Sequence, residues 1–170
     1  MTEKTTKQSH LHTYTYIQHN LGIIHRDIKP ANLMITPDRI LKISDFGVAS
    51  ELSQFSQSDI CSHSHGSPAF QSPQIATGKK SFSGFKLDIW AAGVTLYVLV
   101  TGQYPFQGSN VFHLYEQIAK AEYEIPGWVE KSLADLIRGM MSKEEETRFS
   151  IRQIKENAWF QTTQYNDKPQ

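Results

Sequence analysis

The chain has 170 residues, which is the size of one domain and enough to bury a substantial hydrophobic core. Hydrophobic residues make up 39% and charged residues 20%, proportions typical of globular rather than disordered proteins. Seventeen basic residues balance seventeen acidic ones, so no global field attracts nucleic acid or an anionic membrane. We therefore expect neither as a partner.

The sequence contains a single cysteine, Cys61, which excludes an intramolecular disulfide framework and a cysteine-ligated metal cluster. A reducing compartment fits this composition, so we expect a cytoplasmic protein, with the nucleus as a second location. The most apolar run, residues 89–100, is shorter than the roughly 20 residues that a membrane-spanning helix needs. It predicts a buried helix, and we expect no membrane span.

The N-terminal part of the chain is weakly patterned. Residues 1–10 are polar and without periodicity, so we expect a loose segment there. A weak helical pattern over residues 11–19 leads to Gly22, and glycine is a common residue just after the end of a helix. This pattern predicts a helix that ends before Gly22.

A short β-hairpin and a long loop are predicted next. Residues 33–35 and 41–43 are largely apolar and flank the turn formers Pro37 and Asp38. Residues 50–74 are rich in Ser, His and Pro and predict one long loop. Loops of more than about 12–15 residues in compact domains are usually functional or disordered.

Helices are predicted over most of the remaining chain. One apolar face has members at positions i, i+3, i+4, i+7 and i+8: Leu133, Leu136, Ile137, Met140 and Met141. Phe112, Tyr115 and Ile118 indicate a further helix, and we interpret both faces as core packing. We interpret residues 161–170 as a C-terminal tail.

Two serines have the spacing of helix N-caps. Ser132 precedes Asp135 by three residues, and Ser150 precedes Gln153 by three, each at the start of an apolar run. The fold class that follows is mainly α-helical, with a small β-hairpin at one edge.

The segment that carries chemistry is His25-Arg26-Asp27-Ile28-Lys29-Pro30-Ala31-Asn32, followed beyond the hairpin by Asp45-Phe46-Gly47. Each residue alone has an ordinary explanation, because a single Asp in a loop is usually a turn former or a cap. Together, the fixed offsets and the order resemble the catalytic loop and DFG motif of protein kinases. The resemblance implies the protein kinase-like fold.

The roles that this resemblance implies match the demands of phosphoryl transfer, which needs alignment and charge neutralisation more than covalent chemistry. Asp27 would orient the substrate hydroxyl and accept its proton, and Lys29 would contact the γ-phosphate of ATP. Asn32 and Asp45 would supply oxygen ligands for Mg²⁺, with Mn²⁺ as an alternative metal.

Other residues take supporting roles by the same resemblance. His25 and Phe46 resemble members of the kinase hydrophobic spine, so we expect His25 to be packed rather than active in acid–base chemistry. Asp88, in Asp-Ile-Trp, resembles the aspartate at a helix start that holds the backbone of the catalytic loop.

Residues 66–74, Gly-Ser-Pro-Ala-Phe-Gln-Ser-Pro-Gln, resemble the end of a kinase activation segment. In that position Ser67 would contact Asp27 and Lys29, and the pattern is similar to serine/threonine-specific rather than tyrosine-specific kinases. Arg26 occupies a position that often pairs with a phosphate on this segment. Its candidate partners are the segment's serines, Ser53, Ser56, Ser58, Ser62 and Ser64, each of which is also explained as an ordinary loop serine.

Within the kinases, the chain over residues 17–160 is similar to the liver kinase B family. The sequence segments that carry this similarity are residues 66–71, 82–90, 92–97, 101–106 and 148–154. The resemblance implies an upstream kinase whose protein substrates are the activation loops of AMP-activated-type kinases. It also implies two partners, a pseudokinase adaptor and a helical-repeat scaffold.

Two features depart from the family pattern. The glycine-rich loop and strand lysine of the ATP-binding small lobe have no counterpart before Gly22, so we interpret residues 11–160 as a partial kinase domain, the C-terminal lobe only. We expect this polypeptide alone to be inactive. Gln74 stands where the family has a glutamate that pairs with a late arginine, here Arg148, so we expect a less firmly anchored segment.

An alternative reading from a different class is a truncated or pseudo-kinase that serves as a non-catalytic interaction module. The missing lobe favours it. The presence of all four residues Asp27, Lys29, Asn32 and Asp45 argues against it, because a pseudokinase commonly lacks one of them.

Overall fold

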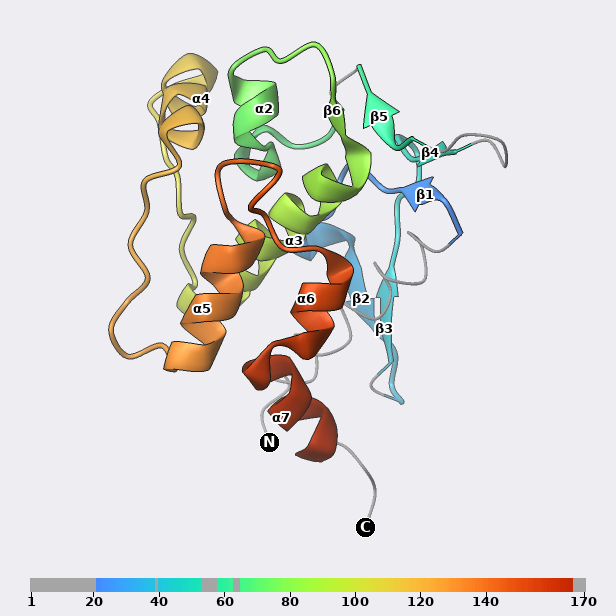
Figure 1. The fold of residues 1–170 in the computed structure, drawn as a ribbon, viewed down its shortest axis with the longest axis vertical. Helices are drawn as coiled ribbons and strands as arrows, with labels where there is room; N and C mark the ends of the chain where they lie inside the picture. The colour runs from blue at the N-terminus through green and yellow to red at the C-terminus, as the bar shows by residue number, and fades with distance from the viewer. Residues whose placement is uncertain (1–20, 39, 53–57, 63–64, 167–170) are drawn as a thin grey trace.

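A computed structural model describes residues 21–38, 40–52, 58–62 and 65–166 (Figure 1). The weak helical pattern of residues 11–19 and the loose segment expected over residues 1–10 lie outside these ranges. In chain order, the elements are β1 (Ile23–Ile24), η1 (Pro30–Asn32), β2 (Leu33–Ile35), β3 (Leu41–Ile43), β4 (Ser50–Glu51), β5 (Ile60–Cys61), η2 (Pro68–Phe70), α2 (Pro73–Ala76), β6 (Phe82–Ser83), α3 (Gly84–Thr101), α4 (Val111–Lys120), α5 (Lys131–Met140), α6 (Ile151–Glu156) and α7 (Ala158–Asn166).

The central element is α3, whose buried residues run without interruption from Leu87 to Tyr97. Ser83 caps its N-terminus by accepting a hydrogen bond from the backbone N–H of Lys86, and Gly102 ends it in a left-handed conformation. Figure 1 shows α3 behind α5 and α6, with α2 and α4 at one end and the strand pairs along one side. The predicted buried helix over residues 89–100 is therefore confirmed as part of α3.

Among the described residues, α3 is also the one helix long and apolar enough to cross a membrane by length and composition. Two-thirds of its length is buried inside the fold, including the fully buried Trp90 and Leu96. It packs on α5 at close range because Gly93 has no side chain: a Cβ there would lie 2.8 Å from Cγ of Met141. Burial of this kind is typical of the core helix of a globular domain.

The strands form three separate antiparallel pairs. The predicted hairpin is confirmed, with Leu33 opposite Ile43 and Ile35 opposite Leu41. The other two pairs, β1 with β4 and β5 with β6, join segments that are distant in the sequence. The prediction of one long loop over residues 50–74 is therefore wrong in part, because β4, β5 and η2 fall inside that range and α2 begins in it.

Two details of the predicted helices are also wrong. α5 begins at Lys131 with Glu130 as its N-cap residue, so Ser132 lies inside the helix and does not cap it. Its neighbour three residues on, Asp135, pairs with Lys131 and Arg138 instead. Phe112 is 77% exposed at the start of α4, whereas Ile118 on the same predicted face is fully buried.

The cap predicted at Ser150 is confirmed and is reciprocal. The Ser150 side chain accepts from the backbone N–H of Gln153, and the Gln153 side chain accepts from the backbone N–H of Ser150. Beyond α6, α7 continues to Asn166, so residues 161–166 of the expected tail are helical.

The two serines provide a matched pair for a stability test. We expect Ser150→Ala to destabilise the protein by about 1 kcal/mol, because one N-terminal N–H of α6 loses its acceptor. For a domain of this size that lowers the melting temperature by about 2–4 °C. Ser132→Ala, which removes no cap, should stay within about 0.5 kcal/mol of the wild type. Thermal unfolding of both variants checks this, and equal losses would contradict the assignment of the caps.

Candidate active site

The buried carboxylate of Asp88, in α3, binds the backbone of the predicted catalytic loop. Oδ2 of Asp88 accepts a hydrogen bond from the backbone N–H of His25 at 2.8 Å, and Oδ1 accepts one from that of Arg26, also at 2.8 Å. Asp88 is fully buried. These bonds hold Arg26 at a φ of 66°, a left-handed conformation that a non-glycine residue adopts only when its surroundings fix it. The role expected for Asp88 matches this geometry.

Asp27 follows directly and is 8% exposed, with partners on both carboxylate oxygens. Its Oδ2 accepts from Nζ of Lys29 at 2.7 Å and from Nδ2 of Asn32 at 3.2 Å. Its Oδ1 accepts from the backbone N–H of Ser67 at 2.9 Å. Three of the predicted site residues therefore converge on the carboxylate of Asp27.

The electrostatic setting keeps Asp27 ionised. Burial alone raises its pKa, but the hydrogen bonds from Lys29 and Ser67 and the charge of Lys29 outweigh it, so the pKa lies below its usual range. A lowered pKa stabilises the fold at pH values above the pKa of the unfolded chain, near 4, and this contribution is lost on acidification. At neutral pH the site therefore presents a carboxylate beside an ammonium.

Ser67 connects the segment after residue 58 to this pair. Its Oγ accepts from Nζ of Lys29 at 2.7 Å, in addition to the bond from its N–H to Asp27. The close approach depends on Gly66, which has a φ of 98°, and a Cβ there would lie 2.3 Å from the carbonyl oxygen of Arg26. The contacts expected of Ser67 with Asp27 and Lys29 are both present.

Asn32 and Asp45 offer oxygen atoms at the same edge. Nδ2 of Asn32 donates to the carbonyl of Asp27 at 2.9 Å, while its Oδ1 accepts no hydrogen bond from the part of the chain that the structure describes. The backbone of Ser44 donates to the carbonyl of Asn32 at 2.9 Å, so Asp45 comes one residue after this contact. Asp45 is exposed at a φ of 66°, and its Oδ1 accepts a long 3.4 Å bond from the Gly47 N–H.

These two residues fit a Mg²⁺ ion better than a metal held by protein ligands alone. An amide oxygen and a carboxylate are ligands that Mg²⁺ prefers, and the ion usually retains waters and phosphate oxygens as its other ligands. Among the described residues, no group of three His, Cys, Asp or Glu side chains could hold a metal. A site of two protein ligands that shares its ion with a nucleotide agrees with this composition.

His25 is packed. It is fully buried, its ring lies 4.9 Å from that of Phe46 in an edge arrangement, and its Nε2 lies 3.2 Å from the carbonyl oxygen of Ser44. Phe46 itself is 47% exposed. The contacts agree with a structural rather than an acid–base role for His25.

Comparison with known proteins identifies the arrangement. The protein kinase domain family matches residues 3–160. The chain belongs to the protein kinase family. It is 55% identical over 142 residues to serine/threonine-protein kinase STK11 of Homo sapiens, a stretch that covers 84% of this chain and 33% of that protein.

Two more distant relatives agree with this result. The stk11 homolog of Dictyostelium discoideum is 47% identical over 141 residues, 83% of this chain and 24% of that protein. Serine/threonine-protein kinase par-4 of Caenorhabditis briggsae is 40% identical over 154 residues, 89% of this chain and 24% of that protein. The chain is similar to serine/threonine-protein kinases of the STK11 type, and it spans about a third of the length of the human relative.

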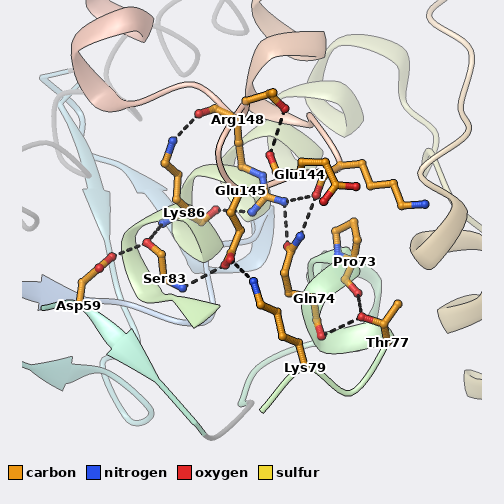
Figure 2. A network of polar contacts seen from close by, with 12 residues as sticks. Asp59, Pro73, Gln74, Thr77, Lys79, Ser83, Lys86, Glu144, Glu145 and Arg148 are labelled. Atoms are coloured by element: carbon orange, nitrogen blue, oxygen red, sulfur yellow. Dashed lines mark hydrogen bonds and ion pairs between the residues drawn. The ribbon is translucent and has the colours of Figure 1, made fainter. Parts of the chain in front are cut away.

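Gln74, at the end of the segment that resembles a kinase activation segment, contacts the buried Arg148, which has no carboxylate partner among the described residues (Figure 2). Arg148 is 1% exposed, and one Nη donates to Oε1 of Gln74 at 2.9 Å and to the carbonyl oxygen of Lys143 at 3.0 Å. The other Nη donates to the carbonyl oxygen of Lys86 at 3.0 Å, and Nε donates to that of Ser142 at 2.9 Å. The positions of Gln74 and Arg148 expected from the family are therefore paired.

Burial is the dominant influence on Arg148 and lowers its pKa to about 10, against the opposing charge of Glu145 and its neighbours. The guanidinium also lies over the Trp90 ring, 5.0 Å from its centroid. Gln74 donates from Nε2 to the carbonyl oxygen of Lys143 at 2.8 Å, so its amide uses both ends. The arginine is satisfied by dipoles instead of a charge.

Several residues of this network carry no signal in the sequence. Lys79 pairs with Glu145 at 2.7 Å, and Glu145 also accepts from the Ser83 N–H at 3.0 Å. Asp59 accepts from the Ser83 side chain and from the Phe85 N–H. These are long-range contacts with no local sequence pattern. Of the serines considered as partners of Arg26, Ser58 and Ser62 are described and exposed, and the other three fall outside the described ranges.

Replacing the neutral partner of Arg148 by a charged one tests this anchor. We expect Gln74→Glu to stabilise the chain by roughly 1–2 kcal/mol, because a buried charge gains a partner that an amide oxygen replaces only in part. Loss of the Nε2 bond to Lys143 brings the value toward the lower limit. Thermal unfolding should show a rise of about 2–4 °C per kcal/mol.

Arg148→Gln alone and combined with Gln74→Glu provide the controls. The gain from Gln74→Glu should disappear once the guanidinium is gone. A gain that persists in the double variant would show that it does not come from pairing with Arg148. No gain at all would show that the three backbone carbonyls, the Gln74 amide oxygen and Trp90 already compensate the buried charge.

Proposed function

We propose that this chain carries the catalytic lobe of a serine/threonine kinase that transfers the γ-phosphate of ATP to protein hydroxyls. The observation that carries the proposal is the convergence of Lys29, Ser67 and Asn32 on the carboxylate of Asp27, at distances of 2.7, 2.9 and 3.2 Å. Membership of the kinase family supports the chemistry.

In this proposal Asp27 aligns the attacking hydroxyl. Its lowered pKa keeps it ionised, so it accepts a hydrogen bond from the hydroxyl throughout, and the proton reaches it only as the oxygen–phosphorus bond forms. Lys29 lies beside it and can place its ammonium against the transferred phosphoryl group. Ser67 holds both side chains in register, which supports serine and threonine rather than tyrosine as acceptors.

Mg²⁺, or Mn²⁺ in its place, would be held by Oδ1 of Asn32 and the carboxylate of Asp45. Bound there with ATP, the ion supplies charge neutralisation for the phosphates. Asn32 is suited to this role because its Nδ2 is already bonded to Asp27, which fixes the direction of its oxygen.

The finer assignment rests on similarity to STK11. We propose that the protein substrates are activation loops of AMP-activated-type kinases, and that a pseudokinase adaptor and a helical-repeat scaffold are its partners. The support is 55% identity to the human relative over most of this chain. We propose a cytoplasmic location with the nucleus as a second site, which the single half-buried Cys61 suits.

We also propose that these 170 residues alone transfer no phosphate. The nucleotide is held in kinases by a glycine-rich loop and a strand lysine, and the sequence has no glycine before Gly22. The exposed apolar side chains Leu21, Met34 and Phe46 lie on the same part of the chain as the catalytic loop and hairpin. Their exposure favours the second candidate, an interaction module that binds another protein through this lobe.

Two aspartate variants separate the proposed roles, in a protein in which this chain follows a complete kinase small lobe. We expect Asp27→Asn and Asp45→Asn each to reduce phosphate transfer at least 100-fold. Higher Mg²⁺ or Mn²⁺ should restore part of the activity of Asp45→Asn, because that variant weakens metal coordination. No metal should restore Asp27→Asn, which has lost proton acceptance and hydroxyl alignment.

Transfer of labelled phosphate to a protein substrate, measured across metal concentrations, checks this. Asp38→Asn, in the exposed hairpin turn, is the matched control and should retain wild-type activity. Identical metal dependence of the two site variants would contradict the roles. The 170-residue chain alone should transfer no phosphate. If it does transfer phosphate, and Asp45→Asn abolishes the transfer, the proposal that the chain is inactive by itself is wrong.

A further inference from the structure

Asp59 lies in the middle of the activation segment, yet its contacts are with the first turn of α3 (Figure 2). Its Oδ2 accepts from the Ser83 hydroxyl and from the backbone N–H of Phe85 at 3.0 Å. Its carbonyl oxygen accepts from the N–H of Gly84 at 2.8 Å. One residue of the segment thus binds three consecutive residues at the N-terminus of the core helix.

The charge of Asp59 suits this position. α3 has no acidic residue in its own first turn, and the N-terminus of a helix carries partial positive charge and unpaired N–H groups. Ser83 already caps α3 by accepting from the Lys86 N–H, so the Asp59 carboxylate satisfies a second N–H of the same turn. It comes from 24 residues earlier in the sequence than Ser83.

The strand pair next to Asp59 extends the same attachment. Ile60 lies opposite Ser83 and Cys61 opposite Phe82. At Gly84 the two surfaces approach so closely that a Cβ would lie 3.0 Å from Sγ of Cys61. The attachment is therefore a small joint, made of a carboxylate, a two-residue strand pair and a glycine contact.

The joint and the catalytic carboxylate are connected on both sides. On the helix side, Asp88 lies one turn beyond Phe85 and holds the catalytic loop that contains Asp27. On the segment side, only residues 62–65 separate Cys61 from Gly66 and Ser67, and an extended chain spans at most about 3.6 Å per residue. The chain between the joint and Ser67 is therefore short, and an attachment at Asp59 limits how far Ser67 can move away from α3.

We propose that Asp59 is a positioning residue of this kinase: its carboxylate fixes the middle of the activation segment to α3 and so holds Ser67 against Asp27 and Lys29. The proposal rests on the function proposed above for its catalytic consequence, but not for its structural one. At its other end the segment is held at Gln74, whose neutral amide contacts Arg148 where a carboxylate would bind more strongly. The attachment at Asp59 therefore contributes more to anchoring the segment.

Hydrogen exchange of the 170-residue chain tests the structural half. In Asp59→Ala the amides of both Phe85 and Ser67 should exchange at least tenfold faster than in the wild type, while amides in α5 stay unchanged. Glu122→Ala removes an exposed acidic side chain elsewhere and should change neither amide. Acceleration at Phe85 with Ser67 unchanged would overturn the proposal, because Asp59 would then be a helix cap alone. If Asp59→Ala does not fold, Asp59→Asn keeps the shape of the side chain and should give the same pattern with smaller changes.

Kinetics test the catalytic half, in a protein in which this chain follows a complete small lobe. Asp59→Asn should lower kcat for the protein substrate at least tenfold, because Asp27 and Lys29 are held less well in their aligned positions, with the KM for ATP within twofold of the wild type. Glu122→Gln is the matched control for the lost charge. Circular dichroism reports the folded fraction of each variant, and a fall in kcat no larger than the fall in folded protein overturns the positioning role. If even the wild type shows no transfer that depends on Asp45, the proposed function fails, and the exchange result still decides whether Asp59 positions Ser67.

Discussion

The two hydrogen bonds from the backbone N–H groups of His25 and Arg26 to the carboxylate of Asp88 are the contacts on which the candidate active site depends. They connect the loop that contains Asp27 and Lys29 to α3, whose residues from Leu87 to Tyr97 are all buried. A left-handed Arg26 is unfavourable by itself, and the fully buried carboxylate compensates by accepting from that same residue. The direction of Asp27, the next residue, is thereby set by the protein core.

The charges near this loop are handled in two different ways. Asp27 has an ammonium beside it and a lowered pKa, so the site contains a true ion pair, at 2.7 Å. Arg148 is surrounded instead by carbonyl dipoles, an amide oxygen and the Trp90 ring, and burial lowers its pKa to about 10. The first arrangement leaves a carboxylate at the edge of the site that can accept a further hydrogen bond, whereas the second only holds two parts of the lobe together.

Much of the candidate site could be predicted because its residues are close in the sequence. Asp27, Lys29 and Asn32 fall within six residues, and a short hairpin with clear apolar strands brings Asp45 back to them. The cap at Ser150 could also be predicted from the sequence, because its partner Gln153 lies three residues away. The roles of the site residues came from the resemblance to kinase motifs, and the short spacing explains why Asp27, Lys29 and Asn32 lie together.

The remainder depended on contacts between distant segments. Strand pairs β1–β4 and β5–β6 have two residues on each strand, too few for any periodicity, and one strand of each pair contacts α3. Ser132 and Ser150 have the same spacing to a polar residue, but Glu130 occupies the cap position of α5. Asp59 could not be found because a carboxylate that caps a helix from 24 residues away leaves no pattern in the sequence.

The most direct test of this account is the exchange of the His25 and Arg26 amides in the wild type and in Asp88→Asn. Both amides should be protected in the wild type to a degree close to that of the core of α3. An asparagine has one acceptor oxygen instead of two, so at least one of the two amides should exchange at least tenfold faster in the variant, and Asp38→Asn should change neither. Wild-type exchange of these two amides at the rate of exposed loop residues would contradict the claim that α3 holds the catalytic loop.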